Sequence, residues 1–132
     1  MDRWMGGMND VTLRLYEFQG NIRRLDDELS ENVFTVPVKR IAAIKIDAEG
    51  FERQFLQGSI ETLKKHKPLI MAESGNRTPG VQDMLASFGY FYSERSGDRL
   101  IPVSGITNAI NGFFVHHDNV ARYSAAGILR NS

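Results

Sequence analysis

Three carboxylates lie within six residues of each other in the segment IKIDAEGFE, which spans residues 44–52. Asp47, Glu49 and Glu52 follow a short apolar run, and Gly50 stands among them. If residues 47–49 continue the extended backbone, Asp47 and Glu49 point the same way, because side chains two apart share a face of a strand. The two carboxylates could then converge on one ligand or one cation.

Helix capping is the simpler interpretation of the same residues. Acidic side chains favour the first turn of a helix, where free N–H groups and the helix dipole stabilise negative charge. Asp47 and Glu49 could cap a helix predicted over residues 51–65, with Gly50 allowing the turn. Three carboxylates nevertheless exceed what one cap needs, and like charges held close raise one another's pKa unless a partner compensates.

A fourth carboxylate follows the next predicted strand. The apolar segments 41–47 and 68–74 are each followed by a helical pattern, which indicates parallel strands with helical crossovers. Ligands bind such sheets beyond the carboxyl ends of the strands. Glu73 should therefore lie at the same edge as Asp47, and Asn76 and Arg77 follow it in a loop where a substrate could enter. An ordinary turn is the alternative for that loop.

The remaining pattern predicts one domain, with a loose leader at 1–10, a core at 11–117 and a weakly helical, fraying tail at 118–132. Within the core, alternation predicts a strand at 11–18, and Asp26 is placed to cap a short helix. On the helix at 51–65 the apolar residues cover a wide buried arc, and Glu52 falls inside that arc, so its charge must be paired. Further expected elements are a helix within 79–90, a hairpin with its turn at 96–98, and a strand at 112–117.

Composition excludes several classes of site. The 132 residues contain 16 Lys and Arg, 16 Asp and Glu, and no cysteine. Without thiolates there is no disulfide and no cysteine-bound metal, and the sequence predicts no metal site of that kind. A formal net charge of zero gives no electrostatic reason to expect nucleic acid or a membrane as partner. The chain is expected to be cytoplasmic.

Three segments together resemble the C-terminal part of FkbM-type methyltransferases. They are LDD at 25–27, IKIDAEGFERQFLQGSIETL at 44–63 and KPLIMAE at 67–73, and the resemblance extends over about residues 22–115. It implies an α/β, Rossmann-like class I methyltransferase sheet, mostly parallel with an antiparallel C-terminal strand. It also implies S-adenosylmethionine as cofactor and O-methylation of a hydroxyl on a sugar or secondary metabolite.

The resemblance assigns roles to individual residues. Asp47 and Glu49 would be catalytic, with a carboxylate positioning the acceptor hydroxyl or accepting its proton. Asp26 and Asp47 would border the cofactor. Glu73 would line the end of the neighbouring strand, on the substrate side. Apart from the resemblance, Asn76 and Arg77 are expected to bind the substrate because of their place in the loop that follows Glu73. Gly50 and Glu52 would be structural.

One departure from the family pattern is large. The glycine-rich turn that normally follows the first strand and approaches the cofactor is absent from this sequence. The sheet is therefore expected to be incomplete, lacking its N-terminal cofactor-loop half, with an exposed edge that could pair in a homodimer. Two alternatives remain open: a non-catalytic remnant or interaction module with the same fold, and a Mg²⁺ or Ca²⁺ site made by Asp47, Glu49 and Glu73.

Overall fold

The computed structural model describes residues 24–30, 38–47, 50–73, 76–105 and 107–130. The predicted leader and the predicted strand at 11–18 lie outside these residues. The described elements, in chain order, are α1 (Leu25–Ser30), β1 (Ala43–Ile46), α2 (Glu52–Gln57), α3 (Ile60–His66), β2 (Leu69–Ala72), α4 (Val81–Ser87), β3 (Tyr90–Ser96), β4 (Arg99–Pro102), β5 (Gly112–His116), the 3₁₀ turn η1 (His117–Asn119) and α5 (Val120–Ala125).

The strands form one five-stranded mixed sheet in the order β1-β2-β5-β3-β4. Among the described strands, β1 and β2 pair in parallel, whereas the pairs β2–β5, β5–β3 and β3–β4 are antiparallel. The prediction of a mostly parallel sheet was therefore wrong, although the antiparallel C-terminal strand is confirmed. The physical reason is that β3 and β4 form the predicted hairpin, and β5 inserts between β2 and β3.

The directions of the strands still favour a common ligand edge. Because β5 is antiparallel to both β2 and β3, the strands β1, β2 and β3 all run the same way. Their carboxyl ends meet at one edge of the sheet, which is called the rim below. It includes the residues that directly follow β1 and β2.

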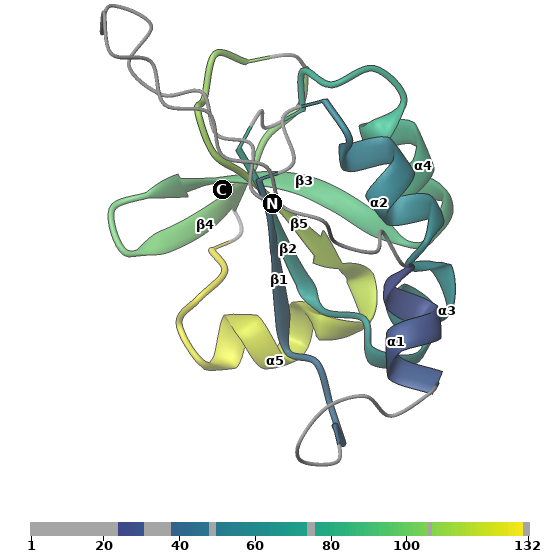
Figure 1. The fold of residues 1–132 in the computed structure, drawn as a ribbon. Helices are drawn as coiled ribbons and strands as arrows, with labels where there is room; N and C mark the ends of the chain where they lie inside the picture. The colour runs from purple at the N-terminus through teal and green to yellow at the C-terminus, as the bar shows by residue number, and fades with distance from the viewer. Residues whose placement is uncertain (1–23, 31–37, 48–49, 74–75, 106, 131–132) are drawn as a thin grey trace, which may run out of the picture.

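Helices cover both faces of the sheet (Figure 1). The helices α1 to α4 lie on one side, and α5 lies on the other. On the first side Leu56, Leu63, Ile70 and Phe114 belong to the larger apolar core. The smaller core contains Val115 and residues of the C-terminal segment.

The helix predicted over residues 51–65 is two helices. Gly58 and Ser59 separate α2 from α3, and the Ser59 hydroxyl donates to the carbonyl of Phe55 at 2.7 Å. A Cβ on Gly58 would lie 3.2 Å from Cγ of Arg24, so the break allows the start of α1 to pack closely there. The predicted buried arc is confirmed at Leu56 and Leu63, but Phe51 is 65% exposed.

The C-terminal segment packs against the sheet, so the prediction of a fraying tail was wrong for residues 118–130. Tyr123 on α5 is buried, and Leu129 forms a bridge with Leu100 of β4. The N–H of Leu100 donates to the carbonyl of Ile128 at 2.7 Å. Burial of these two side chains, Tyr123 and Leu129, stabilises the segment on the sheet. The weak helical pattern of the sequence did not indicate this burial.

Candidate functional site

Asp47 and Glu73 occupy neighbouring positions at the rim. Ile46 pairs with Ala72 in the parallel ladder, and the N–H of Glu73 donates to the carbonyl of Ile46 at 3.3 Å. The next residue on each strand is acidic, and both Asp47 and Glu73 are exposed. The topology thus brings together these two predicted carboxylates, whereas Glu49 lies outside the described residues.

The turn after β1 is built around Gly50 and Glu52. Gly50 has a φ of +97°, a conformation that favours glycine, and its N–H donates to Oε2 of Glu52 at 3.0 Å. The Glu52 side chain is buried at the start of α2, so the charge predicted inside the apolar arc does have a partner. Both residues thereby shape the chain beside Asp47.

Asn76 and Arg77 hold a second loop at the rim. The buried Asn76 amide donates from Nδ2 to the carbonyl of Gly105 at 2.6 Å, and its Oδ1 accepts the N–H of Thr107 at 3.4 Å. Arg77 donates from Nη1 to the carbonyl of Ala109 at 2.9 Å. The two side chains connect the loop after β2 to the segment before β5, and their predicted contact with a substrate stays a prediction.

Three residues of the rim were not predicted from the sequence. The Tyr92 hydroxyl donates to Oε2 of Glu94 at 2.7 Å, and the Thr107 hydroxyl donates to the same oxygen. Burial, together with the hydrogen bond to Glu94, raises the pKa of Tyr92 to about 12, so this hydroxyl keeps its proton at neutral pH. From the sequence, Glu94 could have been placed at the same edge as Asp47 only if the direction of β3 in the sheet had been predicted.

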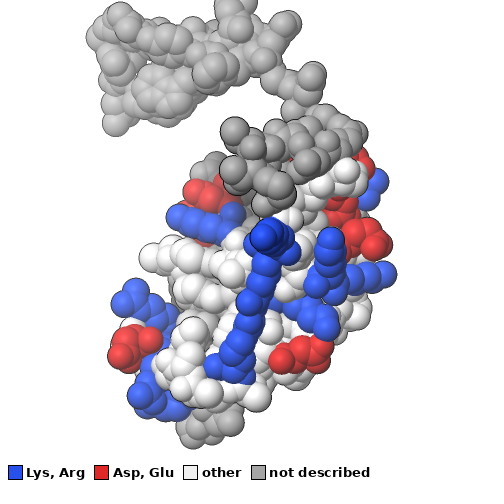
Figure 2. Space-filling view, turned by 90° about the horizontal axis from the view of Figure 1, so that it is seen from below, with Lys and Arg blue, Asp and Glu red and all other residues white. Residues whose placement is uncertain are grey.

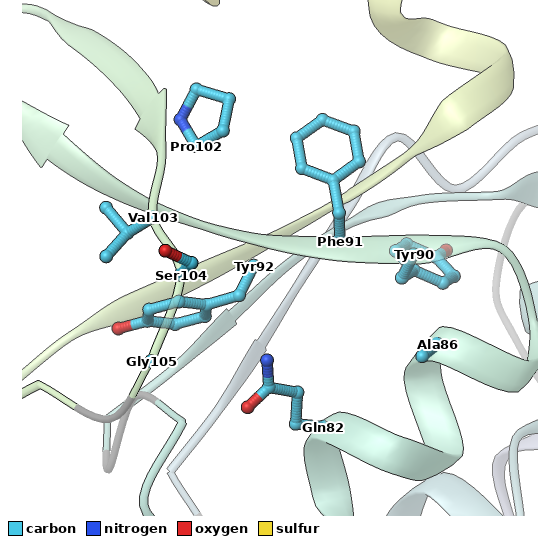
Figure 3. Close-up of a pocket in the computed structure, with 9 residues that line it drawn as sticks. All are labelled: Gln82, Ala86, Tyr90, Phe91, Tyr92, Pro102, Val103, Ser104 and Gly105. Carbon is cyan, nitrogen blue, oxygen red and sulfur yellow. The ribbon is translucent and has the colours of Figure 1, made fainter. Parts of the chain in front are cut away.

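A pocket of about 500 Å³ adjoins this network, between α4, the start of β3 and the chain that follows β4 (Figure 3). β4 pairs with β3 only from Ser93 onward, so the first residues of β3 have no β4 residue beside them. In Figure 3 the ring of Phe91 points to one side of β3, and Ala86 lies on the other. The lining residues are Gln82, Ala86, Tyr90, Phe91, Tyr92, Pro102, Val103, Ser104 and Gly105.

Asp26 lies in the helical layer and not at the end of a strand. Its carboxylate accepts the N–H groups of Glu61 and Thr62, each at 2.9 Å, and the Thr62 hydroxyl at 2.6 Å. Burial raises the pKa of Asp26, but these hydrogen bonds and the charge of Arg24 outweigh it, so the net pKa is lowered. The carboxylate therefore caps α3, not its own helix as the sequence suggested, and its predicted contact with the cofactor stays a prediction.

The end of the sheet opposite the rim carries basic side chains. His66 ends α3 and accepts the N–H of Ile41 on Nδ1 at 3.2 Å. Burial and the charges of Lys65 and Arg40 lower the pKa of His66. Figure 2 shows this face from below, with Lys and Arg side chains crossing its middle. The opposite ends of β1 thus carry charge of opposite sign, with Asp47 at the rim.

Two kinds of feature are absent from the described part of the chain. No three His, Cys, Asp or Glu side chains among these residues are placed to hold a metal ion. None of the described helices is long and apolar enough to cross a membrane.

Parallel strands with acidic residues at their carboxyl ends define an α/β domain of the kind that binds ligands at that edge. The chain belongs to the methyltransferase FkbM domain family, because the family model matches residues 17–100. Members of this family depend on S-adenosylmethionine and have a Rossmann-like methyltransferase fold. No curated protein and no solved structure matches the chain.

The rim fits part of S-adenosylmethionine. That cofactor carries ribose hydroxyls, an ammonium group and a sulfonium group, which are hydrogen-bond donors or positive charges that a carboxylate attracts. Asp47 is exposed, and a Cβ on the neighbouring Gly50 would meet no atom within 4 Å, so there is open space beside the turn. No glycine-rich turn among the described residues would receive the rest of the cofactor.

Proposed function

We propose that this chain forms the acceptor side of an S-adenosylmethionine-dependent O-methyltransferase, whose acceptor is a hydroxyl of a sugar or secondary metabolite. The position of Asp47 and Glu73 on adjacent parallel strands, at one rim, is the observation that carries this proposal. Membership of the FkbM family gives the reaction class. The small-molecule acceptor follows from the resemblance, and the pocket beside Tyr92 is large enough for such a ligand.

S-adenosylmethionine supplies an electrophilic methyl group when it is bound. Asp47 would accept hydrogen bonds from the cofactor at the rim. Together with Glu49, it would also accept a hydrogen bond from the hydroxyl group that is to be methylated. As the hydroxyl oxygen becomes a nucleophile, one of these carboxylates takes its proton, a role that contributes about 10²–10⁴-fold to rate in enzymes.

The other rim residues would orient the acceptor. Glu73 and Glu94 present carboxylates toward the same edge, and carboxylates bind the hydroxyls of a polyol directly. Asn76 and Arg77 fix the loop that contains Gly105, which also lines the pocket. Orientation of this kind lowers the barrier, because the reacting atoms are already aligned.

Methyl-labelled S-adenosylmethionine tests the proposal in a transfer assay with a panel of hexoses, 6-deoxyhexoses and simple phenols. Wild type is expected to label an acceptor, and Asp47→Asn is expected to be about 10²-fold slower. Asp98→Asn, at the exposed hairpin turn, is the matched control and should keep the wild-type rate. Equal rates for Asp47→Asn and wild type would show that Asp47 has no role in the reaction. Binding of the cofactor without any methyl transfer would favour the alternative of a non-catalytic module.

A further inference from the structure

The pocket beside Tyr92 lies at a distance from the carboxylate of Asp47. The ladder pairs place Tyr92 of β3 in one row with Ile44 of β1, and β5 and β2 lie between them. Neighbouring strands are about 4.8 Å apart, so three such spacings separate these two residues by about 14 Å. Asp47 lies three residues beyond Ile44, at the rim. A ligand that reaches from the pocket to Asp47 must therefore be longer than a single sugar ring.

One end of the pocket adjoins the loop after β2. Gly105 lines the pocket, and its carbonyl accepts the hydrogen bond from Nδ2 of Asn76 at 2.6 Å. Asn76 follows Glu73 by three residues, so this contact joins the pocket wall to the end of β2. Tyr92 also lines the pocket, and its hydroxyl donates to Glu94. An elongated ligand can therefore contact both the pocket and the rim.

The surface that lines the pocket is mostly apolar. Both tyrosine hydroxyls in the lining are used within the protein, since Tyr90 donates to the carbonyl of Pro68 at 2.8 Å and Tyr92 donates to a carboxylate at 2.7 Å. The other polar side chains that line the pocket are Gln82 and Ser104 (Figure 3). A sugar buried there would leave several of its hydroxyls without a partner, which is unfavourable. An apolar ring has no such penalty and gains from burial.

The rim has the opposite character. Asp47 and Glu73 are exposed there, and carboxylates accept hydrogen bonds from the hydroxyls of a sugar. The rim and the pocket together therefore match a molecule with a hydroxylated ring at one end and an apolar ring at the other. The separation of β1 from β3 sets the length of that molecule.

We propose that the pocket beside Tyr92 binds the apolar part of the acceptor, and that the acceptor is a glycoside whose sugar lies at the rim and whose aglycone is an apolar ring. Methylation of the sugar hydroxyl at the rim rests on the proposed function. Binding of the aglycone in the pocket does not depend on methyl transfer, so the two can be tested separately.

The 4-methylumbelliferyl glycosides of glucose and rhamnose test the binding step, because their bicyclic aglycone is fluorescent. Wild type is expected to bind them about tenfold or more tightly than the methyl glycosides, which are measured by competition, since the aglycone adds buried apolar surface. Ala86→Trp fills the pocket from α4 and should weaken this binding about tenfold or more. Ala121→Trp, at an exposed position of α5 on the other side of the sheet, is the control and should bind like wild type. Equal affinity of Ala86→Trp and wild type, or no binding of the umbelliferyl glycosides, would overturn the proposal.

Methyl transfer from labelled S-adenosylmethionine to the same glycosides separates this inference from the proposed function. The kcat/KM of wild type is expected to be about tenfold higher for the umbelliferyl glycosides than for the methyl glycosides, and Ala86→Trp should abolish that preference. Binding of the umbelliferyl glycosides without transfer to any acceptor would support the assignment of the pocket and contradict the proposed function. Equal kcat/KM for the two series in wild type would support the proposed function and overturn the inference.

Discussion

Asn76 donates a hydrogen bond from its buried side-chain amide to the backbone carbonyl of Gly105, at 2.6 Å. The two residues are 29 positions apart in the sequence, and each belongs to a loop at the rim. The contact therefore positions the loop after β2 against the segment that lines the pocket. Asn76 therefore stabilises the loops of the candidate site, in addition to its predicted contact with a substrate.

Asn76→Ala should destabilise the fold by about 1–3 kcal/mol, because it removes the hydrogen bonds of the buried Asn76 amide and leaves the Gly105 carbonyl and the Thr107 N–H without this partner. Urea unfolding followed by circular dichroism measures the change. Asn108→Ala, at an exposed position of the partner loop, is expected to change stability by less than about 0.5 kcal/mol. An equal effect of the two substitutions would show that the Asn76 contact contributes no stability.

Asp26→Ala should cost about 1–3 kcal/mol in free energy of unfolding, since its carboxylate accepts two N–H groups and one hydroxyl at the start of α3. The adjacent Asp27→Ala removes a carboxylate of the same size without that cap and serves as the control. Chemical denaturation of both variants provides the comparison. If Asp27→Ala were the more destabilising change, the assignment of Asp26 as the cap of α3 would be wrong.

The stability of the chain should fall as the pH drops below about 6.5, in part because of His66. Its folded-state pKa is lowered by burial and by the charges of Lys65 and Arg40. A group whose pKa is lower in the folded chain than in the unfolded chain stabilises the fold at pH values above its unfolded pKa. As the pH falls, the unfolded chain binds a proton at this group before the folded chain does, and the stabilisation is lost. Protonation also removes the Nδ1 acceptor that the N–H of Ile41 uses.

Urea midpoints at pH 7.5 and pH 5.0 measure the contribution of His66. His66→Gln should lose less stability across this interval than wild type does. His117→Gln, at an exposed histidine, should keep the wild-type pH dependence. An unchanged pH dependence in His66→Gln would contradict the role of this histidine.

Gly89→Ala should be strongly destabilising for two reasons. Gly89 has a φ of +89°, and a Cβ there would lie 2.8 Å from Nε2 of the buried His116. Gly97→Ala shares a positive φ of +64°, but its Cβ would meet no atom within 4 Å. The first substitution should exceed the second by about 1–3 kcal/mol, which thermal unfolding can resolve. Equal losses would mean that His116 moves aside freely.

The sequence predicted the elements of the core well, since alternation and apolar runs determine which segments become strands. The strands at 41–47 and 68–74, the hairpin and the last strand were all found. Placement of Glu73 beside Asp47 also followed from the sequence, because parallel strands with helical crossovers leave little choice of edge.

Long-range hydrogen bonds could not be predicted in the same way. Asp26 caps α3, which begins 34 residues later, because Asp26 and Ile60 are brought together only by packing of α1 on α3. Glu94 gains Thr107 as a partner only when the segment before β5 folds over β3. The order of the strands in the sheet could not be predicted either, because no local sequence pattern indicates that β5 lies between β2 and β3.

Titration of the chain with S-adenosylmethionine by isothermal calorimetry tests most directly whether the rim beside Asp47 receives the methyl donor. Wild type is expected to bind, and Asp47→Asn is expected to bind about tenfold more weakly, since it loses a charged acceptor of hydrogen bonds. Asp98→Asn should bind like wild type. Absence of binding to the wild-type chain, or equal affinity of Asp47→Asn and wild type, would contradict a methyl-donor site at this rim.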